Sequence, residues 1–437
     1  MRASACVILA LCGIMATALA AQTLTSIFSF NGVDGRQPLA PLFQATDGNL
    51  YGTTAYGGAH PNCTPFPGCG TIFKITPSGT LTTIYDFCAQ TGCPDGSQPN
   101  GLIQATDGDF YGTTWGGGAD DVGTVFKITA DGTLTTLYSF CGDYSCGYGE
   151  GPSSTLVQAA NGDFYGTTSG YFGGDGTVFK ITASGTLTTL YSFCVTGCAD
   201  GRSPYAGLVQ ARDGDFYGTT AYGGYGSSGG TIFKITPSGT LTLLYSFCAQ
   251  VACADGQSPF AALVQATNGD FYGTTMNGGN GGNCAGGCGT IFKITPSGAL
   301  TTLYNFCADD SCPHGGGGGS TAGLVQATDG NLYGTSFEVD GHGTVFKLTP
   351  SGTLTTLYRF CDQTGPTAPM STPLRVCMDG ELPRAGLVQA VNGDLYGTTS
   401  DGGIDGGGAK NGDGTVFRLS LGLQDADHQL DRRNEDD

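Results

Sequence analysis

Cysteine is the residue type with the most versatile chemistry in this sequence, because its sulfur can form a disulfide or, as a thiolate, bind zinc. Apart from Cys6 and Cys12, the cysteines fall into pairs that are close in sequence. The pairs are Cys63 and Cys69, Cys88 and Cys93, Cys141 and Cys146, Cys194 and Cys198, Cys248 and Cys253, Cys284 and Cys288, Cys307 and Cys312, and Cys361 and Cys377. We favour local disulfides that pin loops, since the pairs recur along the chain and an export signal precedes them. Two neighbouring pairs could instead ligate zinc, because four thiolates suffice.

Aromatic side chains in Gly-rich loops are the second group of candidates. The candidate ligand-binding residues are Tyr56, Trp115, Tyr171, Phe172, Tyr222 and Tyr225. Rings of this kind could stack on sugars or grip a peptide. The alternative is that they only cover the disulfide-pinned loops. Because they differ from one part of the chain to the next, we expect binding, if it occurs, to use them.

Acidic residues recur in loops as Asp-Gly, two residues, then Pro, at Asp34, Asp95, Asp200, Asp255 and Asp379. Calcium could use such carboxylates together with loop carbonyls, but none of these loops has the dense acid ladder of an EF-hand, so a turn is favoured. The sequence contains no zinc-protease, phosphate-loop or nucleophile-elbow motif. An enzyme with two converging loop carboxylates stays possible, because such a pair leaves no sequence signature.

The elements that position these residues come from an internal repeat. The string Tyr-Gly-Thr, followed by Thr or Ser, begins at Tyr51, Tyr111, Tyr165, Tyr217, Tyr272, Tyr333 and Tyr396. Each copy follows an Asn-Gly or Asp-Gly turn signal and lies among β-branched and aromatic runs that favour strands. Each unit is long enough for four short strands, which predicts a seven-bladed β-propeller.

The first strand is expected to close this ring. The last unit ends near Ser420 without an outer strand, whereas residues 23–30 match the outer strand of the second unit, 133–140. We therefore predict that the N-terminal strand completes the last blade, so that no end blade is left with an open edge. The propeller domain spans residues 22–421.

The two ends of the chain are set apart by composition. Residues 1–20 have Arg2, an apolar stretch and a small-residue cleavage site, which predicts a signal peptide. Residues 422–437 form an acidic tail that we expect to be disordered. The net charge of −19 argues against nucleic acid as a partner. We expect a monomer that is secreted, periplasmic or at the cell surface, without membrane insertion.

Side chains that recur in every unit are expected to serve the scaffold. The recurring glutamines, represented by Gln44 and Gln104, should form hydrogen bonds between blades, although a polar ring around the channel is an alternative. The recurring lysines should be solvated or pair with nearby acids such as Asp109 and Asp215. Because the two hairpin turns of each unit are short and uniform, binding is expected on the opposite face, where loop lengths vary.

The repeat itself resembles a known family. Residues 323–335, Gly-Leu-Val-Gln-Ala-Thr-Asp-Gly-Asn-Leu-Tyr-Gly-Thr, and the following run at 343–358 are similar to the GloVer tandem repeat of exported bacterial proteins. The stretch Asp-Gly-Asn-Leu-Tyr-Gly-Thr also resembles, more distantly, the propeller repeats of two-component sensor domains. The first resemblance implies export, often with a C-terminal surface anchor, and no established activity. This chain ends in an acidic tail without an apolar sorting segment.

The combined expectation is an exported binding or interaction propeller without a cofactor. Its ligand would be a carbohydrate or a protein, held on the face that carries the cysteines and aromatic residues. Two alternatives stay open at this point: a hydrolase or lyase that acts on an extracellular polysaccharide through loop carboxylates, and a structural module of the cell envelope.

Overall fold

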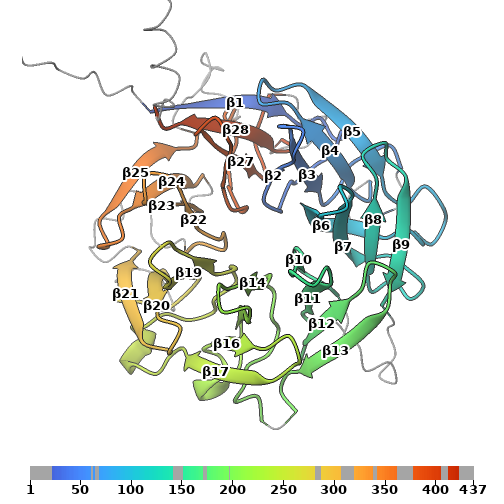
Figure 1. Cartoon of the computed structure of the whole chain (residues 1–437). Coiled ribbons are helices and arrows are strands. Elements are labelled where there is room, and N and C mark those ends of the chain that lie inside the picture. Colours follow the sequence, from blue (N-terminus) through green and yellow to red (C-terminus); the bar gives the residue numbers. More distant parts are fainter. Residues whose placement is uncertain are drawn as a thin grey trace, which may run out of the picture.

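The protein is an all-β propeller of seven blades around a central axis, as the sequence predicts (Figure 1). The computed structural model describes residues 22–60, 63, 68–140, 151–170, 175–195, 197–280, 287–306, 319–337, 342–361, 377–404 and 412–422. Each blade is a four-stranded antiparallel sheet with consecutive strands side by side. In the described ranges no helix is long and apolar enough to cross a membrane. The predicted signal peptide and acidic tail lie outside the described residues, apart from Gly422.

Six blades are built from consecutive strands, and the bounds follow one pattern. Blade 1 contains β2 (Phe43–Gln44), β3 (Leu50–Thr54), β4 (Thr71–Ile75) and β5 (Leu81–Asp86); blade 2 contains β6 (Ser97–Gln104), β7 (Phe110–Gly116), β8 (Thr124–Ile128) and β9 (Leu134–Ser139); blade 3 contains β10 (Val157–Gln158), β11 (Phe164–Thr168), β12 (Thr177–Ile181) and β13 (Leu187–Ser192). Blade 4 contains β14 (Val209–Gln210), β15 (Phe216–Thr220), β16 (Thr231–Ile235) and β17 (Leu241–Ser246); blade 5 contains β18 (Val264–Gln265), β19 (Phe271–Thr275), β20 (Thr290–Ile294) and β21 (Leu300–Asn305); blade 6 contains β22 (Val325–Gln326), β23 (Leu332–Ser336), β24 (Thr344–Leu348) and β25 (Leu354–Arg359). Two short 3-10 helices, η1 (Tyr225–Ser227) and η2 (Val251–Cys253), lie in connections.

Blade 7 joins the two ends of the propeller. Its strands are β26 (Val388–Gln389), β27 (Leu395–Thr399), β28 (Thr415–Ser420) and, as the outermost strand, β1 (Thr23–Ser29). β1 pairs antiparallel with β28 from Thr23 opposite Ser420 to Ser29 opposite Thr415. Figure 1 shows the blue β1 lying along the red β28. The prediction that the first strand completes the last blade is confirmed.

The hydrophobic core is divided into seven clusters, each shared by two neighbouring blades. Between blades 4 and 5, for example, the ring of Tyr217 stacks on Phe271 at 4.1 Å between centroids. The hydroxyl of Tyr217 donates to Asp213 in the preceding turn at 2.9 Å. The repeated tyrosine is therefore a core residue with a satisfied polar end, and each blade is held mainly by its neighbours.

Local contacts also explain why the other residues of the Tyr-Gly-Thr-Thr string recur. In blade 4, a Cβ on Gly218 would lie 2.5 Å from Cζ of Phe233, so only glycine lets the aromatic ring of the next strand cross the backbone. Thr219 donates to the carbonyl of Ala261 in blade 5, and Thr220 shares a hydrogen bond with Thr231 of the adjacent strand. The string therefore encodes stacking, close packing, a contact between blades and a contact within the blade.

The recurring polar residues also serve the scaffold. The side-chain oxygen of Gln104 accepts a hydrogen bond from the backbone N–H of Thr46 in the preceding blade at 2.9 Å. The same contact from Gln44 to Val391 spans the junction of blades 1 and 7. Nζ of Lys127 lies 2.6 Å from Oδ2 of Asp109. The predictions of hydrogen bonds between blades and of lysine–aspartate pairing are confirmed.

Candidate functional site

A cavity of about 690 Å³ occupies the central channel and draws its walls from all seven blades. A volume of this size is within the range of small-molecule and oligosaccharide sites. Its walls come from the inner strands and from the segments that lead into them, together with Tyr56, which follows β3, and Trp115, near the end of β7. Side chains from every blade thus converge on one hollow.

One position of the repeat supplies a different side chain from each blade. It is the residue directly after the proline that precedes the inner strand, or after Ser320 in blade 6, and it lines the cavity in every blade. These residues are Leu39, Asn100, Ser153, Tyr205, Phe260, Thr321 and Arg384, which we call the channel ring. In blade 2 the segment from this proline to the inner-strand glutamine is one residue shorter than in the others. Because no two of the seven are alike, they cannot all serve one repeated scaffold contact.

Aromatic members of the channel ring lie together on blades 4 and 5. The rings of Tyr205 and Phe260 have centroids 5.4 Å apart, and Tyr222 meets Phe260 edge-on at 5.9 Å. Arg202 lies over the Tyr222 ring at 5.9 Å. Burial, followed by the nearby Tyr222, raises the pKa of Tyr205, so its hydroxyl stays a neutral hydrogen-bond donor. The result is a rigid aromatic wall, of which Tyr205 keeps 36% of its surface exposed.

The walls carry one charge. Among the described lining residues Arg384 is the only ionisable side chain other than tyrosine, and no aspartate, glutamate, histidine or lysine lines the cavity. Its guanidinium carbon lies 5.7 Å from the centroid of Phe337, a cation–π distance. The cavity is therefore apolar and aromatic, with hydroxyl groups from Ser153 and Thr321 and a positive group on one side, whereas the amide nitrogen of Asn100 donates to Thr113 and to the carbonyl of Pro152.

A second group of titratable side chains lies on the connections of blades 6 and 7. His342 Nδ1 is 3.4 Å from Glu381 Oε2, and Glu381 pairs through its backbone with Asp401. Burial, followed by the charge of Asp401, raises the pKa of Glu381. Burial also raises the pKa of Asp401, although the Ser400 hydroxyl and the charge of Arg384 oppose the shift. A raised pKa makes a carboxyl group better suited to act as a proton donor.

The recurring loop aspartates have structural partners. Asp255 accepts hydrogen bonds from the Tyr245 hydroxyl at 2.9 Å and from the backbone N–H of Ala249 at 3.1 Å. Asp95, Asp200 and Asp379 have equivalent contacts with a tyrosine of the outer strand and with the N–H of a cysteine. These contacts are those of a turn that anchors the connection to the next blade. Calcium binding by these carboxylates stays the less favoured alternative.

Disulfides pin the connections on the face of the loops with variable length. The structure shows Cys63–Cys69, Cys88–Cys93, Cys194–Cys198, Cys248–Cys253 and Cys361–Cys377, and Cys288 is also disulfide-bonded. Cys141, Cys146, Cys284, Cys307 and Cys312 lie outside the described residues.

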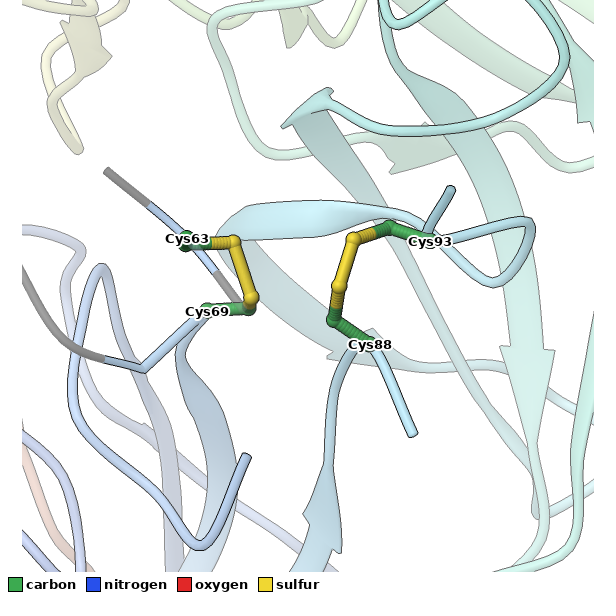
Figure 2. Close-up of side chains that lie close together, drawn as sticks. All are labelled: Cys63, Cys69, Cys88 and Cys93. Atoms are coloured by element: carbon green, nitrogen blue, oxygen red, sulfur yellow. A yellow bond between two sulfur atoms is a disulfide. The ribbon is translucent and has the colours of Figure 1, made fainter. Parts of the chain in front are cut away.

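Two of these disulfides lie side by side in blade 1, one from the β3–β4 connection and one from the β5–β6 connection (Figure 2). The four sulfurs are all within 4.8 Å of one another, close enough for a tetrahedral metal site. As disulfides, however, they offer no thiolate to a metal. The zinc alternative for this group therefore requires reduction of both bonds. The arrangement also shows that these two kinds of connection emerge at the same end of the blade.

The predicted aromatic residues do not all lie at the cavity. Tyr56 and Trp115 line it, and Tyr222 contacts the lining residue Phe260. Tyr225 lies in η1 outside the lining, with 68% of its surface exposed. Tyr171 and Phe172 lie outside the described residues. The structure thus brings three of the six predicted binding residues to one place.

Sequence reasoning missed the channel ring. The proline before the ring residue belongs to the Asp-Gly turn pattern in blades 1, 2, 4, 5 and 7, but that pattern does not single out the residue after it. A usable signal was present, because Leu39, Tyr205, Phe260 and Arg384 differ sharply at equivalent places in otherwise similar units. The group formed by His342, Glu381 and Asp401 left no such signal, since its members are far apart in sequence.

Comparison with known proteins starts from the repeat that builds this site. The family model of the Gloeobacter/Verrucomicrobia repeat matches residues 66–284 and 249–406, which together cover most of the propeller. The chain belongs to the Gloeobacter/Verrucomicrobia repeat family. No curated protein matches the chain. The resemblance noted in the sequence is confirmed, and this member of the Gloeobacter/Verrucomicrobia repeat family is a closed propeller.

Solved structures are similar in fold. An extracellular domain assigned to a hybrid two-component system of B. thetaiotaomicron is 11% identical, with a TM-score of 0.54 over 93% of this chain and 44% of that one. The present chain therefore spans less than half the length of that domain. A polysaccharide lyase is 15% identical with a TM-score of 0.46, covering 88% and 89% of the two chains. At such identities the similarity of this Gloeobacter/Verrucomicrobia repeat protein concerns the propeller alone.

Proposed function

We propose that this protein is an exported carbohydrate-binding propeller whose ligand enters the central channel and stacks on its aromatic wall. The observation that carries the proposal is the channel ring, where seven equivalent positions hold seven different side chains around one cavity. Residues required by the blade recur in every blade, whereas these do not. Several disulfides are in keeping with an oxidising compartment outside the cytoplasm.

The shape and chemistry of the cavity favour a sugar over a protein surface. A hollow of about 690 Å³ takes a chain end or a short oligosaccharide, whereas a stable protein interface needs a broad patch of about 800 Å² on each partner. The rings of Tyr205, Phe260 and Trp115 present flat apolar faces, and Ser153 and Thr321 supply hydroxyl groups beside them. Flat faces with nearby hydrogen-bonding groups fit the alternating apolar and hydroxyl surfaces of a sugar ring.

The double variant Trp115→Ala/Tyr205→Ala is expected to weaken binding of any oligosaccharide ligand by about tenfold or more, the effect of losing central aromatic contacts. The measurement is a glycan array followed by isothermal titration of each hit. Tyr225→Ala is the matched control, because this tyrosine is exposed outside the cavity. The affinity of the Tyr225→Ala variant for the same ligand should equal that of the unmodified protein. Binding that survives the double variant, with both variants folded by circular dichroism, would refute a channel site.

A second candidate function follows from the raised pKa values of Glu381 and Asp401 near the positive wall. A carboxyl group whose pKa is raised is suited to donate its proton to a leaving oxygen, as in polysaccharide cleavage. This role determines the direction in which activity changes with pH, because activity requires the protonated acid. Activity should therefore fall as the pH rises through the elevated pKa of that group.

If the protein cleaves a polysaccharide, Glu381→Gln should reduce the rate by at least about 100-fold, the usual contribution of a general acid. Release of reducing ends or unsaturated products from a panel of polymers is the readout. Asp131→Asn, in the β8–β9 turn, is the control and should keep full activity. Cleavage that is unaffected by Glu381→Gln would remove this residue from the reaction.

A further inference from the structure

Arg384 has no counterpart in the scaffold of the other blades. The equivalent positions hold aliphatic, aromatic, hydroxyl and amide side chains, so packing of a blade does not require a cation there. In the described part of the chain Arg384 is exposed to the cavity and is not among the salt bridges, whereas Arg418 and most of the recurring lysines pair with aspartates. The guanidinium therefore has donor groups to offer to a ligand.

The position of the guanidinium is nevertheless restrained. Pro383 fixes the backbone directly before it, and the Phe337 ring lies 5.7 Å from the guanidinium carbon. The charge of Arg384 lowers the pKa of Asp401, but burial dominates there and the pKa of Asp401 is raised overall. A guanidinium that lies over an aromatic ring and is not among the salt bridges of the described residues is suited to recognise an anion.

The charge of the whole protein makes this site distinctive. With a net charge of −19, the protein as a whole repels anionic polymers. Within the cavity the balance is reversed, because the only charged group on the described walls is positive. An anion in the cavity would therefore have one cationic partner, whereas a neutral ligand would receive only the weaker hydrogen bonds that a guanidinium gives to an uncharged oxygen.

The ring places this cation across the channel from the aromatic wall. Arg384 belongs to blade 7, while Tyr205 belongs to blade 4, on the far side of a seven-bladed ring (Figure 1). A ligand that uses both must present an apolar face at one end and a negative group at the other. Sugars with a carboxylate or sulfate substituent have this combination of surfaces.

We propose that the ligand is an acidic saccharide, whose carboxylate or sulfate is bound by the guanidinium of Arg384 while a sugar ring stacks on Tyr205 and Phe260. This inference rests on the proposed carbohydrate-binding function and adds the ligand class. A planar guanidinium holds two oxygens of either group through parallel charge-assisted hydrogen bonds. Uronate-bearing and sulfated sugars share this chemistry, and the experiment separates them.

The test uses the full mature protein on an array that carries uronate-bearing and sulfated oligosaccharides beside their carboxyl-reduced and desulfated counterparts. The unmodified protein should bind acidic members about tenfold or more tightly than their neutral counterparts in titrations of the hits. Arg384→Gln should abolish this preference, while Arg384→Lys should keep part of it. Preference for the uronates or for the sulfated sugars identifies which group is recognised. Acidic binding should also weaken with added salt.

Lys74→Gln is the control, because Lys74 is a recurring scaffold cation in β4 and is not part of the cavity lining. It should leave the acidic preference unchanged. If acidic and neutral members bind equally well and both lose binding in Trp115→Ala/Tyr205→Ala, the inference of an acidic ligand is overturned. The proposed carbohydrate site is then still supported. An acidic preference that persists in Arg384→Gln would also overturn the inference. Binding to no member of the array would overturn both proposals.

Discussion

Deletion of residues 22–30 is expected to prevent the propeller from folding into a closed ring. These residues form β1, which pairs with β28 along its whole length, and they include the fully buried Phe30. Without them blade 7 would expose an open edge, and its core cluster with blade 1 would lose one of its central rings, which packs edge-on against Phe73 at 5.3 Å. Phe30→Ala alone should cost about 3 to 5 kcal/mol.

The measurement is thermal unfolding by circular dichroism together with limited proteolysis of the truncated and full-length proteins. A synthetic peptide of residues 22–31 should restore protease resistance to the truncated protein, because the peptide can add the missing strand. A scrambled peptide of the same composition is the control and should have no effect. An unchanged melting temperature of the truncated protein would show that the pairing of β1 with β28 does not stabilise the closed propeller.

The second large effect is expected from Gly218→Ala in the Tyr-Gly-Thr string of blade 4. The added Cβ would lie 2.5 Å from Phe233 and 2.8 Å from the Cδ2 atom of Leu208, and both neighbours are buried in the cluster between blades 3 and 4. Neither side chain can move without disturbing its own contacts. Overpacking of this kind costs about 1 to 3 kcal/mol, and we expect the upper end of that range.

Gly323→Ala is the matched control, because its added Cβ would meet only the Ala262 carbonyl oxygen, at an ordinary 3.5 Å. Urea unfolding should show a clearly lower midpoint for Gly218→Ala and a nearly unchanged one for Gly323→Ala. Combining Gly218→Ala with Phe233→Leu, which removes the crossing ring, should recover part of the loss. Equal urea midpoints for Gly218→Ala and Gly323→Ala would show that close packing is not the reason why this glycine recurs in the string.

The architecture could be predicted because it depends on contacts that recur. Tyr217 and its six counterparts repeat at nearly regular intervals, and a repeated string implies repeated neighbours. The role of Gln104 also followed from recurrence, since a half-buried amide that appears in every unit is expected to have the same partner in every unit. The closure by β1 could be predicted because the missing strand of the last unit matches the first residues of the domain.

The site could be predicted only in part, because direction into the channel is not encoded by residue type. Trp115 and Tyr225 are both aromatic residues of Gly-rich sequence, yet the structure places Trp115 at the end of β7, where it lines the cavity, and Tyr225 in η1 outside the lining. Arg384 and Phe260 became notable once the blades had been arranged around one axis. The pairing of His342 with Glu381 depends on the meeting of two connections, for which a single sequence offers no pattern.

The channel ring has a consequence for how such proteins can diversify. Its residues lie outside the seven core clusters, so a substitution at a position such as Leu39, Phe260 or Arg384 changes the cavity without removing a core contact between the blades. Each blade can therefore vary its channel-ring residue independently of the other blades. Duplicated copies of a gene with this design could acquire new ligands by a few point mutations, without first gaining stability to tolerate them.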